Sequence, residues 1–179
     1  MSVDSDARAK PKAAGGPFSG YAEPGERPPF LSYAVLAGTF TAAVGGALLA
    51  AKRSGRGLPR TVGVGDLLLI GTAGHKLSRL ISKDKVTSFL RAPFTEYQGR
   101  GGPSELEERA RGRGARKAVG ELLACPYCLG LWVVSALHVG LVFAPRFTRF
   151  VASTFTALTI SDFLQIAYKA AEDRGLGGS

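Results

Sequence analysis

The chain contains two cysteines, Cys125 and Cys128, separated by a proline and a tyrosine. Thiols at the start of a helix face unpaired backbone N–H groups and the positive end of the helix dipole, and both favour the thiolate. Proline is well placed in a first helical turn. Because the thiolate is the reactive form, these residues are the candidate catalytic groups of a membrane-bound thiol-disulfide oxidoreductase.

The tetrapeptide from Cys125 to Cys128 is similar to the redox motif of glutaredoxins. A glutaredoxin also needs a βαβ setting to bind its substrate thiols, and no strand pattern is predicted around this motif. The structural alternative is a pair of small, reduced residues at a helix start. The pair also cannot be a secreted-type disulfide framework, which staples distant parts of a chain.

Metal binding is the second chemistry open to the pair, since Cys-x-x-Cys is half of a tetrahedral zinc site. The only histidines are His75 and His138. His138 follows Cys128 by ten residues on one expected helix, hence by about 15 Å at 1.5 Å per residue. A zinc site at the cysteines would need carboxylates or a partner subunit, and we expect no cofactor.

The elements that would position these groups are transmembrane helices. Mean hydropathy is only +0.09, but the apolar residues occur in blocks. The run 30–51 carries no charge and has the ~20 residues that a helix needs to cross a bilayer. A cleaved signal peptide is the alternative for this run, but its apolar region would be too long and its leader nearly neutral.

We therefore predict an all-α fold, a polytopic membrane bundle of three to four transmembrane helices. Within the loop, Ser104 is expected to cap a short helix beginning at Glu105. The predicted segments are a disordered tail 1–29, transmembrane helix 30–51, amphipathic or transmembrane helix 62–90, basic cytoplasmic loop 91–120, transmembrane helix 121–144 with the cysteines at its start, transmembrane helix 147–169, and a tail 170–179.

The formal charge of +9 is predicted to orient the chain. Lys and Arg collect in cytoplasmic loops, and 83–122 holds nine of them against two in the turn before the last helix. If 62–90 crosses, both termini are cytoplasmic. If it lies in the interface, the N-terminus is outside and the basic loop 52–60 is cytoplasmic. Both arrangements place the central loop, the cysteines and the C-terminus in the cytoplasm, at a bacterial inner membrane.

Asp162 is the carboxylate in the last apolar segment, where an unpaired charge is expensive. Its expected partner is a cation of the amphipathic helix, Arg79 or Lys76, and we take Asp162 with Arg79 as the predicted intramembrane polar pair. An ion or proton path is the functional alternative, but it would need several such residues in series.

Small residues recur every fourth position in the first apolar run, at Ala34, Gly38, Ala42 and Gly46. Such a stripe lets another helix approach closely, so the expected partners are the bilayer and a second copy or another membrane protein. The Arg/Gly run 109–117 could bind RNA or anionic lipid, but it lacks the aromatic residues that stack on bases. We expect no nucleic acid.

Three pieces of sequence occur together: Leu-Ser-Arg-Leu-Ile at 77–81, Asp-Lys-Val at 84–86 with Arg-Ala-Pro-Phe at 91–94, and Cys-Pro-Tyr-Cys-Leu-Gly-Leu-Trp at 125–132. In this order they resemble the bacterial membrane family catalogued as domain of unknown function 1360, which includes sporulation-associated members. The resemblance implies an integral membrane protein and supplies no catalytic residues. The leading hypothesis is a non-enzymatic structural or partner-binding component linked to sporulation or envelope development.

Overall fold

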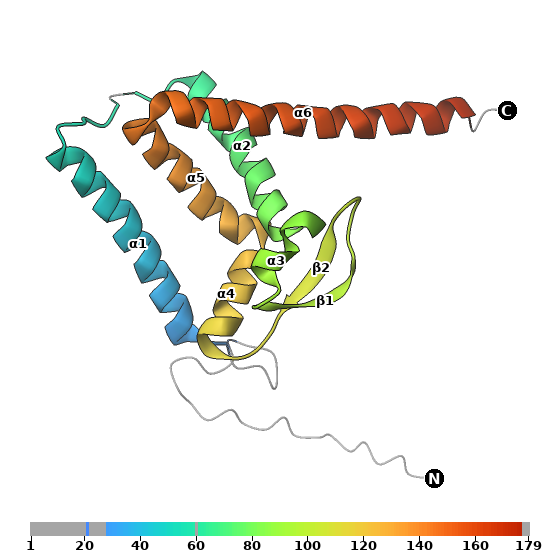
Figure 1. Cartoon of the computed structure of the whole chain (residues 1–179), viewed down its shortest axis with the longest axis horizontal. Helices are drawn as coiled ribbons and strands as arrows, with labels where there is room; N and C mark the ends of the chain where they lie inside the picture. The colour runs from blue at the N-terminus through green and yellow to red at the C-terminus, as the bar shows by residue number, and fades with distance from the viewer. Residues whose placement is uncertain (1–20, 22–27, 60, 177–179) are drawn as a thin grey trace, which may run out of the picture.

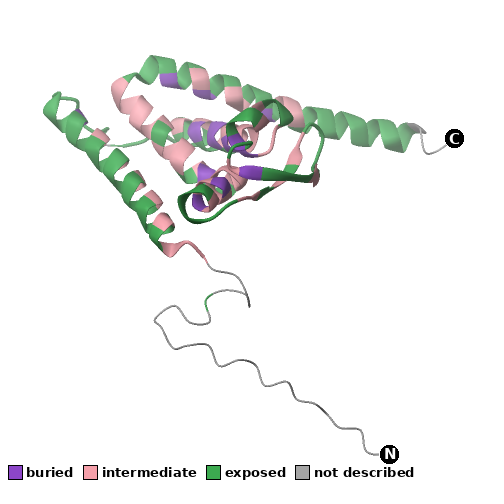
Figure 2. Ribbon diagram, turned by 60° about the horizontal axis from the view of Figure 1, so that its bottom comes forward, coloured by how far each residue is buried: buried purple, intermediate pink, exposed green. Residues whose placement is uncertain are grey.

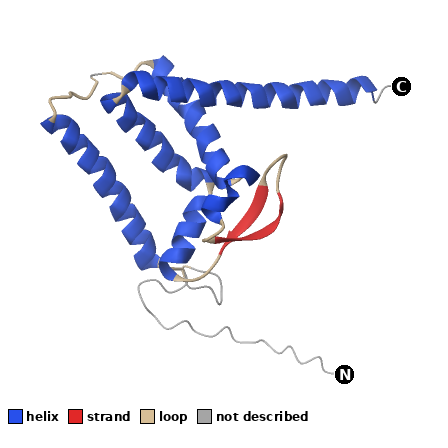
Figure 3. Cartoon of the chain, in the orientation of Figure 1, coloured by secondary structure: helices blue, strands red, loops and turns tan. Residues whose placement is uncertain are grey.

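The computed structural model describes residues 21, 28–59 and 61–176. It contains four long helices and a smaller polar region, residues 83–124 (Figure 1). Figure 3 shows that the strands form one short hairpin beside the helices. The elements are α1 Phe30–Arg53, α2 Val64–Ser82, a 3₁₀ turn η1 Lys85–Thr87, α3 Ser88–Arg91, β1 Thr95–Arg100, β2 Leu106–Ala110, α4 Gly114–Ala124, α5 Pro126–Phe143 and α6 Pro145–Leu176.

Helices α1 and α5 run in the same direction. Near the start of α1, the Tyr33 hydroxyl donates to Glu121 in α4, the helix that leads directly into α5. Just beyond the end of α1, Nη1 of Arg56 donates to the carbonyl of Phe143, the last residue of α5. Contacts at both ends therefore fix the parallel arrangement.

Helix α2 runs opposite to α5, and α6 crosses α2 at a steep angle with its contacts in the same order along both helices (Figure 1). Asp66 pairs with Arg149, and Thr156 Oγ1 donates to the Leu69 carbonyl at 3.0 Å. The next contact, Lys76 to Asp162, is further along both helices. The first part of α6 therefore packs on α2, and its later part extends away from the other helices (Figure 1).

Helix α2 lies at the centre of the described structure. It packs against both α5 and α6, and it holds five buried residues, while α1 and α5 hold one each. A Cβ placed on Gly74 would lie 2.4 Å from Val134 Cγ2, so the two backbones approach closely there. Figure 2 shows the buried residues gathered around this region, with α1 and the far part of α6 largely exposed.

The ends of α1 are set by proline and glycine. Two prolines precede it, and Gly55 stops it with a φ of 69°. The Gly55 N–H reaches the Lys52 carbonyl and the Arg56 N–H reaches the Ala51 carbonyl, which is the Schellman pattern of helix termination. Glycine is the residue that adopts this backbone conformation without a Cβ penalty.

The segment 91–120, predicted to be a loop, contains the β1–β2 hairpin and the start of α4. The predicted helix at Glu105 is wrong: Ser104 has a φ of 63° in a turn, and Glu105 forms a β-bridge with Asp84. The sequence does not predict the strands because their side chains are mostly charged or polar, without the alternation of apolar and polar residues that marks a half-buried strand. Ion pairs replace the usual apolar face, as between Lys83 and Glu107.

Three other predicted boundaries differ from the structure. The segment 121–144 is not one helix, because α4 ends at Ala124 and α5 begins at Pro126, whose missing N–H interrupts the helical ladder. The segment 62–90 ends as a helix at Ser82, and the last helix extends from Pro145 to Leu176. The predicted disorder of 1–29 concerns residues that lie almost wholly outside the described ones.

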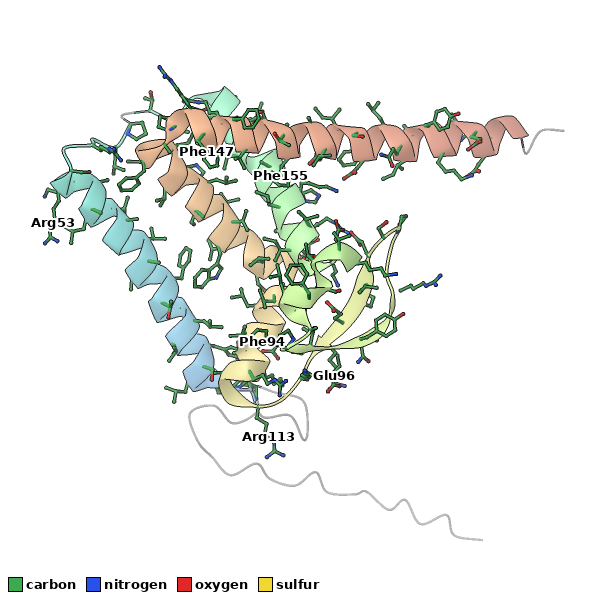
Figure 4. The ribbon with its side chains drawn as sticks, in the orientation of Figure 1. Arg53, Phe94, Glu96, Arg113, Phe147 and Phe155 are labelled. Carbon is green, nitrogen blue, oxygen red and sulfur yellow. The ribbon has the colours of Figure 1, made fainter. Side chains whose placement is uncertain are left out.

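We expect Gly120→Ala to destabilise the protein by about 1–3 kcal/mol, since overpacking at a rigid site costs that much. A Cβ on Gly120 would lie 2.4 Å from the Phe94 carbonyl oxygen and 3.0 Å from the Ala110 Cβ. Figure 4 shows Phe94 beside α4. Thermal unfolding in mild detergent measures the effect. Gly65→Ala is the control, because nothing lies within 4 Å of its added Cβ. Equal melting temperatures for the two variants would contradict this close approach.

Candidate functional site

The two cysteines lie at the junction between α4 and α5. Cys125 is the N-cap of α5, with Pro126 as its first residue, and the Cys125 Sγ accepts the Cys128 N–H at 3.2 Å. Both cysteines are free thiols, Cys125 half-buried and Cys128 exposed. The sulfur therefore occupies the place of a capping oxygen, and satisfies one of the N–H groups that a helix start leaves unpaired.

Replacing Cys125 separates a capping role from a redox role. Serine accepts the same hydrogen bond, so Cys125→Ser is expected to keep the thermal stability of the protein, whereas Cys125→Ala should lose about 1 kcal/mol. Thermal unfolding under reducing conditions measures both. A redox enzyme would lose activity equally in the two variants. Equal stability of serine and alanine variants would show that the cap contributes nothing.

The cysteines do not form a metal-binding cluster with the histidines. Among the described residues there is no group of three or more His, Cys, Asp or Glu side chains that could hold an ion. His138 instead has its Nδ1 2.9 Å from the Val134 carbonyl of its own helix. His75 is exposed on α2.

Arg91 is the centre of the polar module, which we define as residues 83–124. Its side chain is fully buried and forms an ion pair with Glu108, whose side chain is 6% exposed. Nη1 donates to the Ile81 carbonyl at 2.6 Å and to Thr87 Oγ1 at 2.9 Å, and Nη2 donates to the Asp84 carbonyl at 3.1 Å. One guanidinium thus joins the end of α2, the η1 turn and strand β2.

The charged residues of α2 are paired with its neighbours. Lys76 Nζ lies 2.6 Å from Asp162 Oδ2 in α6, and Arg79 binds both carboxylate oxygens of Glu105. The predicted pair of Asp162 with Arg79 is therefore wrong. Asp162 pairs with Lys76, the other cation expected, and Arg79 pairs with Glu105. Geometry explains this, because Arg79 lies one turn closer to the hairpin.

Asp84 lies where the two ion pairs of α2 meet the hairpin. Burial raises the pKa of its carboxyl, as do Glu105 and Asp162, while Lys76 and Arg91 oppose the shift. Because the pKa of Asp84 is higher in the folded protein than in the unfolded chain, the protonated carboxyl favours the folded state at low pH. This contribution to the free energy of unfolding is lost as the pH rises through the folded-state pKa.

Removing the Asp84 charge should therefore help at neutral pH. We expect Asp84→Asn to melt at or above the wild-type temperature at pH 7, and its advantage to shrink toward pH ~4, where an ordinary aspartate protonates. Thermal melts from pH 4 to 8 measure the difference. A variant that is less stable at pH 7 would mean that the attraction of the Asp84 carboxylate to the nearby charges of Lys76 and Arg91 outweighs its burial.

Sequence reasoning missed the most buried polar contact, Arg91 with Glu108. The sequence places Arg91 at the start of a predicted loop, and its burial depends on a hairpin that the polarity pattern does not predict. One sequence feature does indicate pairing: Glu105, Glu107 and Glu108 follow a segment rich in Lys and Arg.

Three described helices are long and apolar enough to cross a membrane: Phe30–Arg53, Pro126–Phe143 and Pro145–Gly175. Together with the mostly helical fold, they define the class as a helical protein suited to membrane association. A family model described as "Protein of unknown function (DUF1360)" matches residues 69–168, and the chain belongs to this family. No curated protein and no solved structure matches the chain.

The family match confirms the resemblance read from the three sequence pieces. It spans α2 from Leu69 through the polar module to Tyr168 in α6. The matched region therefore contains both thiols and the ion pairs of Arg91, Lys76, Arg79 and Lys83, whereas α1 and Asp66, the partner of Arg149, lie outside it. The family description names no activity, so it assigns no chemistry to these residues.

Proposed function

We propose that this chain is a four-span protein of the bacterial inner membrane that serves as a non-enzymatic, partner-binding component. The parallel arrangement of α1 and α5 carries the topology. If α5 crosses the bilayer, α1 ends on the side opposite to the polar module. The chain must then cross the bilayer again, through α2, to reach the module. A three-span arrangement would require α1 antiparallel to α5, so the contacts at Tyr33 and Arg56 support the four-span proposal.

The inner position of α2 supports a fourth span. Its 19 residues reach about 28 Å at 1.5 Å per residue, close to the ~30 Å of a hydrocarbon core. Helix α2 is not among the three helices that are apolar enough to cross a membrane, because it carries Asp66, Lys76 and Arg79. Polar groups in membrane helices are tolerated when they face the bundle and pair with one another, and each of these three has an ion-pair partner.

Charge bias supports a cytoplasmic position for the polar module. This side carries the nine Lys and Arg of 83–122. The opposite side carries fewer basic residues, namely Lys52, Arg53, Arg56, Arg60, Arg146 and Arg149.

Single cysteines distinguish the topologies, in a chain with Cys125→Ser and Cys128→Ser. Ser54→Cys follows α1, and Ser104→Cys lies in the hairpin turn. With a membrane-impermeant maleimide added from the periplasmic side, we expect Ser54→Cys to react and Ser104→Cys to react only after the inner membrane is permeabilised. Labelling of both residues from the same side would establish three spans. Recovery of unlabelled, folded protein in the supernatant without detergent would overturn membrane insertion.

The local chemistry favours a structural role. The buried guanidinium of Arg91 is used in four contacts within the fold, and the Cys125 sulfur caps a helix. The alternative, a thiol oxidoreductase, rests on the free pair alone. Exchanging both cysteines for serine should leave the phenotype of a complemented deletion strain unchanged, and sporulation and envelope integrity are the phenotypes suggested by the family resemblance. Loss of complementation would favour the redox alternative.

The small-residue stripe is the proposed contact with a second copy. Ala34, Gly38, Ala42 and Gly46 are exposed, and they are offset by two residues from the face that carries half-buried Phe40 and Val44. Two residues correspond to about 200° around a helix, so the stripe faces away from the bundle. A Cβ on Gly38 or Gly46 would meet nothing within 4 Å.

Disulfide cross-linking in membranes tests this contact in the cysteine-free chain. Ala42→Cys is expected to give a dimer on oxidation, because a close helix pair brings equivalent stripe positions together. Val44→Cys, on the packed face, is the matched control and should stay monomeric. Equal cross-linking of the two variants would indicate random collision and would remove the stripe as a specific contact.

A further inference from the structure

An apolar cavity of about 350 Å³ lies between α1, the loop after it and the second half of α5. Its walls include Val44, Ala47 and Leu48 from α1 and Val139 and Val142 from α5. The volume is within the ~300–1,000 Å³ of ordinary ligand sites. The lining side chains are apolar except for Ser135 and His138, so hydrocarbon is the chemistry that this space accepts.

The cavity is elongated along α5. Its lining residues on that helix run from Ser135 to Phe143, which spans about 12 Å at 1.5 Å per residue. One helical turn before Ser135, the rings of Phe40 and Trp132 meet with their centroids 5.2 Å apart and join α1 to α5. The inner end is therefore bounded by an aromatic pair, and a slender apolar chain fits the remaining shape.

A cation stands at the other end. The Arg56 guanidinium lies 5.4 Å from the ring centroid of Phe143, a lining residue, and its Nη1 donates to the Phe143 carbonyl at 3.3 Å. Arg56 is exposed, so the other N–H groups of its guanidinium can bind an anion. Arg53 differs, because its side chain points away from the bundle (Figure 4).

We propose that this cavity binds one acyl chain of an anionic phospholipid, whose phosphate is bound by Arg56. The inference rests on the proposed insertion of α1 and α5 into the bilayer, which brings the cavity to the level of the acyl chains and Arg56 to the headgroups. A helix from a second copy does not fit: at a diameter of ~10 Å, 12 Å of helix fills roughly 900 Å³. The planar guanidinium of Arg56 can donate two parallel hydrogen bonds to phosphate oxygens, so the site should prefer an anionic lipid.

The single tryptophan of the chain, Trp132, reports on the cavity directly. The protein is reconstituted into phosphatidylcholine vesicles that contain a small fraction of phosphatidylglycerol brominated in mid-chain, and bromine quenches the Trp132 fluorescence on contact. The matched sample has brominated phosphatidylcholine at the same fraction in phosphatidylglycerol. We expect about fivefold greater occupancy near Trp132 by the anionic lipid, since one basic group near a headgroup is worth about 1 kcal/mol.

Two pairs of variants locate the effect. Arg56→Gln should remove the preference for phosphatidylglycerol, whereas Arg53→Gln, which removes an equal charge that points away, should keep it. Ala47→Phe fills the cavity and should reduce quenching, whereas Leu49→Phe adds its ring on the opposite, exposed face and should not. The Arg56 pair decides the case even if Ala47→Phe fails to fold.

Equal quenching by the two brominated lipids in the unaltered protein, or equal losses in Arg56→Gln and Arg53→Gln, would overturn the anionic lipid site. Trp132 fluorescence that is protected from both brominated lipids, with the protection lost as the protein is diluted into more lipid, would also overturn the lipid site. That result would indicate that a second copy of the chain covers the cavity. Absence of quenching by either lipid in a protein that does not float with vesicles would instead remove the proposed membrane insertion. The two failures are thus distinguishable.

Discussion

Arg91→Met is expected to lower the free energy of unfolding by about 3–5 kcal/mol, the cost of breaking a buried ion pair from one side. Glu108 would remain almost fully buried without its cation, and the carbonyls of Ile81 and Asp84 would lose their guanidinium donor. The loss should be this large because three separate elements depend on one side chain. Equilibrium unfolding of the purified protein in mild detergent measures it.

The matched control is Lys83→Met, which breaks a neighbouring pair of the same module. Lys83 lies 3.0 Å from Glu107, whose side chain is 54% exposed, so water can replace the cation and the cost should stay below about 1 kcal/mol. Adding Glu108→Met to Arg91→Met should recover part of the loss, since two apolar side chains leave no buried charge. If Arg91→Met costs no more than Lys83→Met, the buried pair is not the centre of the module.

The long apolar helices could be predicted from sequence because their signal is local. An uncharged run such as 30–51 predicts a helix of membrane-spanning length whatever surrounds it. The same argument finds α5 and most of α6. The structure agrees on these three elements, and it differs at boundaries such as Cys125, where one proline separates two helices that composition alone joins.

The polar module could not be predicted because its stability is not local. Arg91 is seventeen residues from Glu108, and the excess of cations before the glutamates indicates pairing without indicating the hairpin that brings these two together. The strands lack the apolar alternation that normally reveals a strand, since ion pairs such as Lys83 with Glu107 take the place of apolar contacts. For the same reason, the choice between Lys76 and Arg79 as the partner of Asp162 depended on the position of Glu105, which requires the hairpin.

Lys76→Met is expected to destabilise the protein by about 2–3 kcal/mol, the cost of leaving a charged carboxylate in a membrane helix without its partner. The side chains of Lys76 and Asp162 are 20% and 45% exposed within the chain, and the proposed topology places lipid against these exposed parts. Lys76→Asp should cost more, because two carboxylates would then face each other. Exchanging the pair, with Lys76→Asp and Asp162→Lys together, should restore most of the stability.

Lys169→Met provides the reference for an ion pair in water. Lys169 lies 2.7 Å from Asp173 on the same helix, both residues are more than half exposed, and such pairs contribute about 0.5 kcal/mol. All variants are compared by unfolding in the same bilayer-like detergent. A loss below about 1 kcal/mol for Lys76→Met, together with no recovery in the exchanged pair, would mean that water reaches Asp162. Such a result would place this ion pair beside a water-filled space or at the headgroups, and not against lipid tails.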